Sequence, residues 1–263
     1  MELIKNILIK LSGNSFAQNL LQKNIYISQY LSGIGAGSIA EQSGERFIFE
    51  ILKKKYKAPY CIFDVGANRG QYLKLINQYL LRDETSIHCF EPHKESFEYL
   101  KVNNDNPNLQ VNNLALSNEA GEKKLFYSDN DTRLACLTKR KLDHFNIELD
   151  NSQMVKVETI DSYCVKNNIE RINLLKIDVE GYELFVLQGA TKMFENKRID
   201  IVTFEFGGTG IDTKIFVQDF YYFFKNYNKT LYRITPSGYL YKIEKYNEML
   251  EQFRTTNFAV IDN

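Results

Sequence analysis

The stretch that most restricts the fold is Tyr60–Gly70, an apolar run that leads into a turn containing two glycines. The run predicts a buried strand, and residues 71–80 carry apolar side chains at the spacing of a helix. Gly66 and Gly70 have no Cβ, so the backbone can turn sharply and a ligand can lie against it. Asn68, between them, tolerates a positive φ better than most residues. A strand, such a turn and a helix N-terminus together are typical of a nucleoside-binding site in an α/β protein.

The turn also indicates which class of nucleoside it binds. A dinucleotide fingerprint has three glycines in the pattern G-x-G-x-x-G, whereas this chain has D-x-G-x-N-x-G, with Asp64 two residues before Gly66. The acid points into the space that a pyrophosphate would fill, so a cationic or zwitterionic ligand is favoured. S-adenosylmethionine fits because it carries a sulfonium and an ammonium and no phosphate. Two alternatives stay open: an NAD-dependent oxidoreductase, which shares the turn, and a tight turn that binds no ligand.

A second acidic strand end follows at the expected distance. Ser86–Phe90 predicts a strand, and Glu91 comes next, 21 residues after Gly70. In βαβ units an acid about 20 residues beyond the glycine turn accepts hydrogen bonds from ribose hydroxyls, so we expect Glu91 to bind the ribose. His88 lies within this strand and is expected to be a satisfied core histidine. Residues 109–117 predict a third strand.

Two later strands also deliver acids at their carboxyl ends, where open α/β sheets bind ligands. Arg171–Ile177 precedes Asp178, and Glu205 lies near the end of Ile199–Phe206. A hydroxyl acceptor must lose its proton during transfer, which calls for a general base or a metal. Asp178 is the first candidate base, Glu205 the second and Glu180 the third; alternatively, these acids bind the cofactor's ammonium or cap the next helix. Asp178 and Glu205 could also hold a divalent cation such as Mg²⁺.

The alternation of strands and helices predicts one large α/β domain, because no Pro/Gly/Ser-rich linker divides the 263 residues. We place this domain at residues 44–263, preceded at residues 1–43 by a helical segment that could act as a lid. Residues 128–151 are polar and without a clear period, which indicates an irregular insertion. Residues 231–243 predict a hairpin, and residues 257–261 predict a closing strand.

Composition narrows the classes of partner and the compartment. Lysine plus arginine number 33 and aspartate plus glutamate number 33, and this balance disfavours a nucleic-acid partner. The four cysteines form no C-x-x-C pair, which favours free thiols in a reducing compartment, the cytoplasm, over disulfides or a metal site. No run reaches the ~18 apolar residues that span a bilayer. His93 and His144 are isolated in polar regions, without the spacing of a metal site, and Lys176 is expected to be structural or solvated.

Three further segments have a structural interpretation. Residues 1–11 place apolar side chains on one helical face, which predicts a docking helix, with a weak membrane-surface contact as the alternative. Ser32–Ser38 contains G-x-G-x-G, but no predicted strand precedes it, so the context of a nucleotide site is missing. That segment is expected to be either a flexible lid or an exposed connection. The aromatic helix Val217–Tyr227 predicts core or dimer contacts, so a homo-oligomer stays open.

Three stretches together resemble the FkbM family of S-adenosylmethionine-dependent methyltransferases: FDVGANRGQY, CFEPHKESFEYLKVNN and ETIDSYCVKNNIERINLLKIDVEGYELFVLQGA. The similarity runs from about Gly44 to Gly208, and its KIDVEGYE string is specific. It implies a Rossmann-like methyltransferase fold, with a mostly parallel central sheet, helices on both faces and an antiparallel last strand. It also implies O-methylation of a hydroxyl on a sugar, a glycan or a related small molecule.

The resemblance further implies which residues contact the cofactor. These are Asp64, Gly66, Asn68 and Gly70 for the methionine part, Glu91 for the ribose hydroxyls, Ala115 and Leu116 for the adenine, and Asp178 for the transferred methyl. A rival from another class is a non-catalytic module that binds cofactor or glycan within an assembly. Such a module would bind S-adenosylmethionine without turnover on any acceptor.

Overall fold

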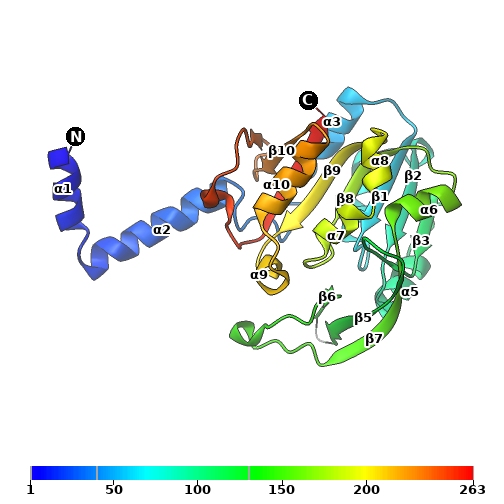
Figure 1. Cartoon of the computed structure of the whole chain (residues 1–263), viewed down its shortest axis with the longest axis horizontal. Helices are drawn as coiled ribbons and strands as arrows, with labels where there is room; N and C mark the ends of the chain where they lie inside the picture. The colour runs from blue at the N-terminus through cyan, green and yellow to red at the C-terminus, as the bar shows by residue number, and fades with distance from the viewer. Residues whose placement is uncertain (1, 40, 130, 263) are drawn as a thin grey trace.

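The computed structural model describes residues 2–39, 41–129 and 131–262 of the chain. They form an α/β body from which two helices extend as an arm (Figure 1). The main sheet has eight strands in the order β11-β10-β12-β9-β8-β1-β2-β3. They are β1 (Tyr60–Val65), β2 (Thr85–Phe90), β3 (Leu109–Asn112), β8 (Ile172–Ile177), β9 (Ile199–Phe206), β10 (Lys229–Ile234), β11 (Leu240–Lys242) and β12 (Thr256–Asp262).

Most of this sheet is parallel. Strands β3, β2, β1, β8 and β9 pair with one another in parallel. Their carboxyl ends therefore meet at one edge of the sheet, where α/β proteins bind ligands. The last strand, β12, lies antiparallel between β9 and β10, and β10 forms a hairpin with β11. The predicted Rossmann-like fold with an antiparallel last strand is confirmed.

Helices cover both faces of the main sheet (Figure 1). Successive side chains of a strand point to opposite faces, so Ile62 belongs to one apolar core and Phe63 to the other. The Ile62 core contains α3 (Phe47–Lys55), α4 (Gln71–Tyr79) and α5 (Lys94–Val102), and the Phe63 core contains α6 (Ile160–Lys166), α7 (Glu183–Gln188), α8 (Thr191–Glu195) and α10 (Val217–Asn226). The remaining turns of helix are α9 (Thr209–Thr213), η1 (Arg82–Glu84), η2 (Asp143–Phe145) and η3 (Glu248–Leu250).

Several sequence predictions about the core are confirmed. In the aromatic helix α10, Phe220 and Phe224 are buried, with ring centroids 4.5 and 5.9 Å from that of Phe204. His88 is buried, and its Nδ1 lies 2.9 Å from the Tyr163 hydroxyl, so it is a satisfied core histidine. All four cysteines are free, and three of them are buried.

A second sheet, in the order β4-β7-β5-β6, lies below the main sheet in Figure 1. Its strands are β4 (Ala115–Leu116), β5 (Gly121–Ser128), β6 (Asp131–Cys136) and β7 (Asn151–Glu158). Two predictions need correction here. The third strand predicted within residues 109–117 is present as β3 but ends at Asn112, because the Asn113 amide donates hydrogen bonds to the Glu91 and Pro92 carbonyls and β4 joins the second sheet. Residues 128–151 contain β6, because pairing with β5 orders a segment whose own sequence shows no period.

The arm consists of α1 (Glu2–Leu11) and α2 (Ser15–Leu31). The glycine-rich segment that follows α2 lies against the body, where the Gly35 and Gly37 N–H groups donate to the Thr255 carbonyl at 2.9 and 3.2 Å. The expectation of an exposed connection is therefore wrong for Gly33–Gly37, which is mostly buried. A helix rather than a strand precedes the segment, as expected. The idea that it acts as a lid stays a prediction.

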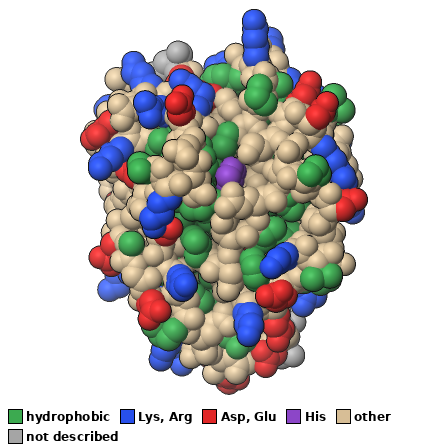
Figure 2. Space-filling model, turned by 90° about the vertical axis from the view of Figure 1, so that its right-hand side faces the viewer, with side chains coloured by type: hydrophobic (Ala, Val, Ile, Leu, Met, Phe, Trp, Pro, Cys, Tyr) green, Lys and Arg blue, Asp and Glu red, His purple; other side chains and the backbone are tan. Residues whose placement is uncertain are grey.

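The surface agrees with the balanced composition. On the face of the body remote from the arm, acidic and basic side chains are interspersed (Figure 2). Within the described ranges, no helix is both long enough and apolar enough to cross a bilayer.

Candidate functional site

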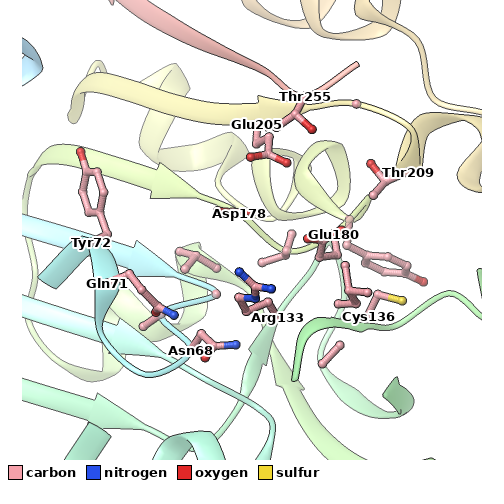
Figure 3. Close-up of a pocket in the computed structure, with 18 of the residues that line it drawn as sticks. Asn68, Gln71, Tyr72, Arg133, Cys136, Asp178, Glu180, Glu205, Thr209 and Thr255 are labelled. Atoms are coloured by element: carbon pink, nitrogen blue, oxygen red, sulfur yellow. The ribbon is translucent and has the colours of Figure 1, made fainter. Parts of the chain in front are cut away.

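A cavity of about 880 Å³ opens at the carboxyl edge of the main sheet (Figure 3). Its walls come from the turns after β1, β2, β8 and β9, from β6, and from residues 35–39 and 253–255. Most of the predicted site residues line it. They are Asp64, Gly66, Asn68, Glu91, Ala115, Leu116, Asp178, Glu180 and Glu205.

Gly70 is the predicted site residue that does not belong to this lining. Its φ of 86° lies in the left-handed region, and a Cβ on it would come within 2.7 Å of Leu100 Cδ1. Gly70 therefore permits the sharp start of α4 and the close approach of α5, which is a structural role.

The turn after β1 is shaped by backbone contacts that only glycine allows. Gly66 has a φ of 84°, and a Cβ there would lie 1.8 Å from the Asp178 carbonyl oxygen. Asn68 adopts the predicted positive φ, at 45°. Its N–H donates to Glu91 Oε2 at 2.8 Å, which joins the turn after β1 to the end of β2.

Asp64 is a buried carboxylate in the cavity wall, near the end of β1, with 1% of its surface exposed. Among the described residues, its one hydrogen bond comes from the Cys89 thiol, at 3.9 Å between sulfur and oxygen. Burial raises the pKa of Asp64 to about 7, although the charge of Lys176 opposes the shift. A buried carboxylate with so little compensation is suited to a cationic ligand.

Glu91 is also buried, and its two oxygens are held in place by the backbone. Oε2 accepts from the Asn68 N–H, and Oε1 accepts from the His93 N–H at 2.7 Å. Burial raises the pKa of Glu91 to about 7, and these two hydrogen bonds oppose the shift. An ionised carboxylate can accept about four hydrogen bonds, so both oxygens retain capacity for hydroxyl donors. His93 itself is buried, and its Nδ1 lies 3.2 Å from Ser96 Oγ.

Lys176 is a site residue that the sequence analysis missed. It is buried inside β8, and its Nζ lies 3.2 Å from Asp178 Oδ2 and 3.8 Å from Glu45 Oε1. Burial alone would lower the pKa of Lys176, but Asp178 and then Glu45 raise it more strongly. Glu45, which precedes α3, is buried and accepts a hydrogen bond from Ser43 Oγ at 2.9 Å. A lysine within the apolar run of β8 was a usable signal, whereas nothing local marked Glu45.

The turn after β8 carries two of the predicted acids, Asp178 and Glu180. Its backbone is held by a further acid, Glu183. Glu183 Oε1 accepts hydrogen bonds from the N–H groups of Val179 and Gly181, at 3.1 and 3.0 Å. These bonds hold Glu180 at a φ of 57° and keep Asp178 at the cavity wall. Glu183 was not predicted, although it explains why an acid follows the turn in the KIDVEGYE string.

Three carboxylates gather at this edge of the sheet. Oxygen atoms of Asp178, Glu180 and Glu205 lie within 4.8 Å of one another. Glu180 is already paired, since its Oε2 lies 2.6 Å from Nη1 of Arg140, whose side chain is 8% exposed. Burial, followed by the charges of Asp178 and Glu180, raises the pKa of Glu205 well above its ordinary value. Oxygen ligands at this spacing suit a divalent cation, but Arg140 and Lys176 already neutralise two of the three acids.

Strand β6 also lines the cavity, and none of its residues was predicted to be in the site. Arg133 and Cys136 face the same space as Asn68 and Glu180 in Figure 3. Arg133 Nε and Nη2 each lie 2.8 Å from an oxygen of Asp131, and its side chain is 70% exposed. Its guanidinium can therefore meet a molecule that enters the cavity.

Comparison with known proteins agrees with this geometry. A model of the methyltransferase FkbM domain matches residues 64–257. The chain belongs to this family. Membership confirms the resemblance found in the sequence and places the chain among the S-adenosylmethionine-dependent methyltransferases. The NAD-dependent oxidoreductase is accordingly not favoured.

Proteins similar to this chain include one that is similar in sequence and one that is similar in structure. The hexuronic acid methyltransferase AglP of Haloferax volcanii is 25% identical over 178 residues, which cover 67% of each chain. The crystal structure of an FkbM methyltransferase from Methylobacillus flagellatus KT matches with 13% identity and a TM-score of 0.44. That match covers 90% of this chain and 59% of the other, which is less than two thirds of its length.

Proposed function

We propose that this chain transfers the methyl group of S-adenosylmethionine to a hydroxyl of a sugar, either free or within a glycan. The observation that carries the proposal is Asp64, a buried carboxylate beside a glycine turn, with a thiol as its hydrogen-bond donor. A sugar acceptor is supported by the hexuronic acid named for the Haloferax relative.

The residues around the cavity fit the cofactor part by part. Asp64 and the turn through Gly66 would hold the cationic methionine portion. Glu91, with acceptor capacity left on both oxygens, would receive the two ribose hydroxyls. Ala115 and Leu116, which are buried and apolar, would lie against the adenine. When bound, S-adenosylmethionine supplies an electrophilic methyl on a sulfonium.

The chemical step is an in-line displacement, so positioning of the acceptor hydroxyl supplies most of the acceleration. The acceptor oxygen forms a bond to the methyl carbon while the carbon–sulfur bond breaks, and the hydroxyl proton must leave. We assign that proton to Asp178, whose carboxylate reaches the cavity with 39% of its side chain exposed. Lys176 Nζ, 3.2 Å from Asp178 Oδ2, donates a hydrogen bond that orients the carboxylate.

Glu205 and Glu180 remain second and third candidates for the base. The raised pKa of Glu205 favours a protonated carboxyl, which makes it a weaker candidate for the base than Asp178 and able to donate a hydrogen bond to an acceptor oxygen. Glu180 is engaged by Arg140, so it orients the wall of the site in this assignment. That Asp178 and Glu205 share a Mg²⁺ ion also stays a prediction. If they do, adding a chelator should lower the activity of the purified protein.

The test is transfer of a labelled methyl group from S-adenosylmethionine to a panel of oligosaccharides, some with uronic acids and some neutral. We expect label in a sugar product with the wild-type chain. Binding of S-adenosylmethionine with no transfer to any sugar would favour the non-catalytic module. Transfer only to protein or nucleic acid in a cell extract would refute the sugar acceptor.

A further inference from the structure

The arm exposes an unusual amount of apolar surface. In α2, Phe16, Leu20, Ile27 and Leu31 form one stripe along the helix, and each is between 58% and 80% exposed. Leu21 and Ile25 lie well round the helix from that stripe and are 46% and 47% exposed. No described residue of α2 is buried. A helix with apolar side chains on more than one side is normally buried among other protein elements.

The chain's own body does not cover this surface. α2 is fastened to the body at its C-terminal end, where the Arg254 guanidinium lies 4.8 Å from the centre of the Tyr26 ring. Arg254 Nη1 also donates to Gln29 Oε1 at 2.6 Å, and the Gln29 amide donates to Gln252 at 2.9 Å. These contacts fix the direction of α2, which leads away from the body in Figure 1.

A lipid surface fits α2 poorly. Helices that lie in a membrane interface carry lysine and arginine along a polar face that contrasts with one apolar face. Among the seventeen residues of α2 the one charged residue is Lys23, and the polar positions are mostly amides and serines. Neither helix of the arm is long and apolar enough to span a bilayer.

We propose that the arms of two copies of this chain pack against each other and make the protein a dimer. Complete burial of one large apolar side chain removes about 60 to 120 Å² of its surface from contact with water. Eight such side chains from α1 and α2 would bury about 500 to 1,000 Å² on each copy, and a stable interface needs about 800 Å² per partner. Because Lys23 is the one charged residue of α2, this helix repels a second copy little and offers little charge pattern to a different partner.

The experiment measures the oligomeric state of the full chain by sedimentation velocity and light scattering. The test variant combines Leu20→Asp with Ile27→Asp, two exposed residues on the same stripe. The matched control is Gln22→Asp, which adds a charge to an exposed amide position off that stripe. Because all three side chains are exposed, each variant is expected to keep the circular dichroism spectrum and melting behaviour of a folded body.

We expect the wild-type chain and the control to be dimers at micromolar concentration, and the double variant to be a monomer. A monomeric wild-type chain across this range would overturn the proposal, as would a double variant that stays dimeric. Flotation of the wild-type chain with phosphatidylcholine–phosphatidylglycerol vesicles, lost in the double variant, would also overturn it, because the arm would then bind lipid. None of these readouts depends on methyl transfer.

Discussion

Replacing Asp64 by asparagine should make the protein more stable and, at the same time, a poorer binder of S-adenosylmethionine. In the folded chain burial raises the pKa of Asp64 from 3.8 to about 7. The native state therefore holds this proton between about pH 4 and pH 7, while the unfolded state releases it. The contribution of Asp64 to stability accordingly falls as the pH rises through this window and is fully unfavourable above about pH 7.

The size of the effect follows from the shift. About three pKa units at 1.36 kcal/mol per unit give a ceiling of about 4 kcal/mol at pH 8. Asparagine has a similar shape and no charge to desolvate, so we expect a gain of about 2 kcal/mol or more. For a domain of this size that corresponds to a rise in Tm of at least about 4 °C. Without the carboxylate, the affinity for S-adenosylmethionine should fall at least about tenfold, or about 1.4 kcal/mol.

Thermal unfolding by circular dichroism at pH 8 and pH 5 would measure the first effect, and calorimetric titration the second. The stability gain of Asp64→Asn should shrink at pH 5, where the wild-type carboxyl is largely protonated. Asp150→Asn, an exposed substitution of the same kind, should change neither quantity. An Asp64→Asn variant that is less stable at pH 8 than the wild type, or that binds the cofactor equally well, would refute this account of the cavity.

Three further predictions follow from the same site. The affinity of the wild-type chain for S-adenosylmethionine should fall about tenfold from pH 8 to pH 6, because Asp64, with a pKa of about 7, takes up a proton; calorimetry showing no pH dependence would contradict this. Asp178→Asn should lower kcat about 10²- to 10⁴-fold in a labelled-methyl assay while cofactor affinity changes little, and an unchanged kcat would remove Asp178 from the proton transfer. Arg133→Ala should raise KM for a uronic-acid acceptor about tenfold and leave KM for a neutral sugar unchanged, whereas equal effects on both would argue against recognition of an acceptor carboxylate.

The sequence was sufficient to find the acids at the carboxyl ends of the parallel strands. Each of them ends an apolar run, and parallel strands bring their carboxyl ends to one edge, so Asp64, Glu91, Asp178 and Glu205 could be placed together without a structure. The glycine turn could also be predicted from the sequence, because the positive φ of Gly66 and the close approach of the Asp178 carbonyl leave no room for another residue.

The parts of the cavity formed by β6 and by Glu45 could not be predicted in this way. Strand β6 has a weak pattern and is ordered by pairing with β5, so the position of Arg133 depends on a contact between segments. Glu45 lies far from Lys176 in the chain. The two side chains meet because α3, which follows Glu45, packs on the face of the sheet that carries Ile62. Local sequence patterns do not record either of these long-range contacts.

The most direct test of the central claim is a crystal structure of the chain with S-adenosylhomocysteine, the product of methyl transfer. We predict electron density for S-adenosylhomocysteine in the cavity, with its amino-acid portion beside Asp64 and Gly66 and its ribose hydroxyls on Glu91. A cavity that stays empty at saturating ligand, or a nucleoside bound elsewhere on the chain, would contradict the account.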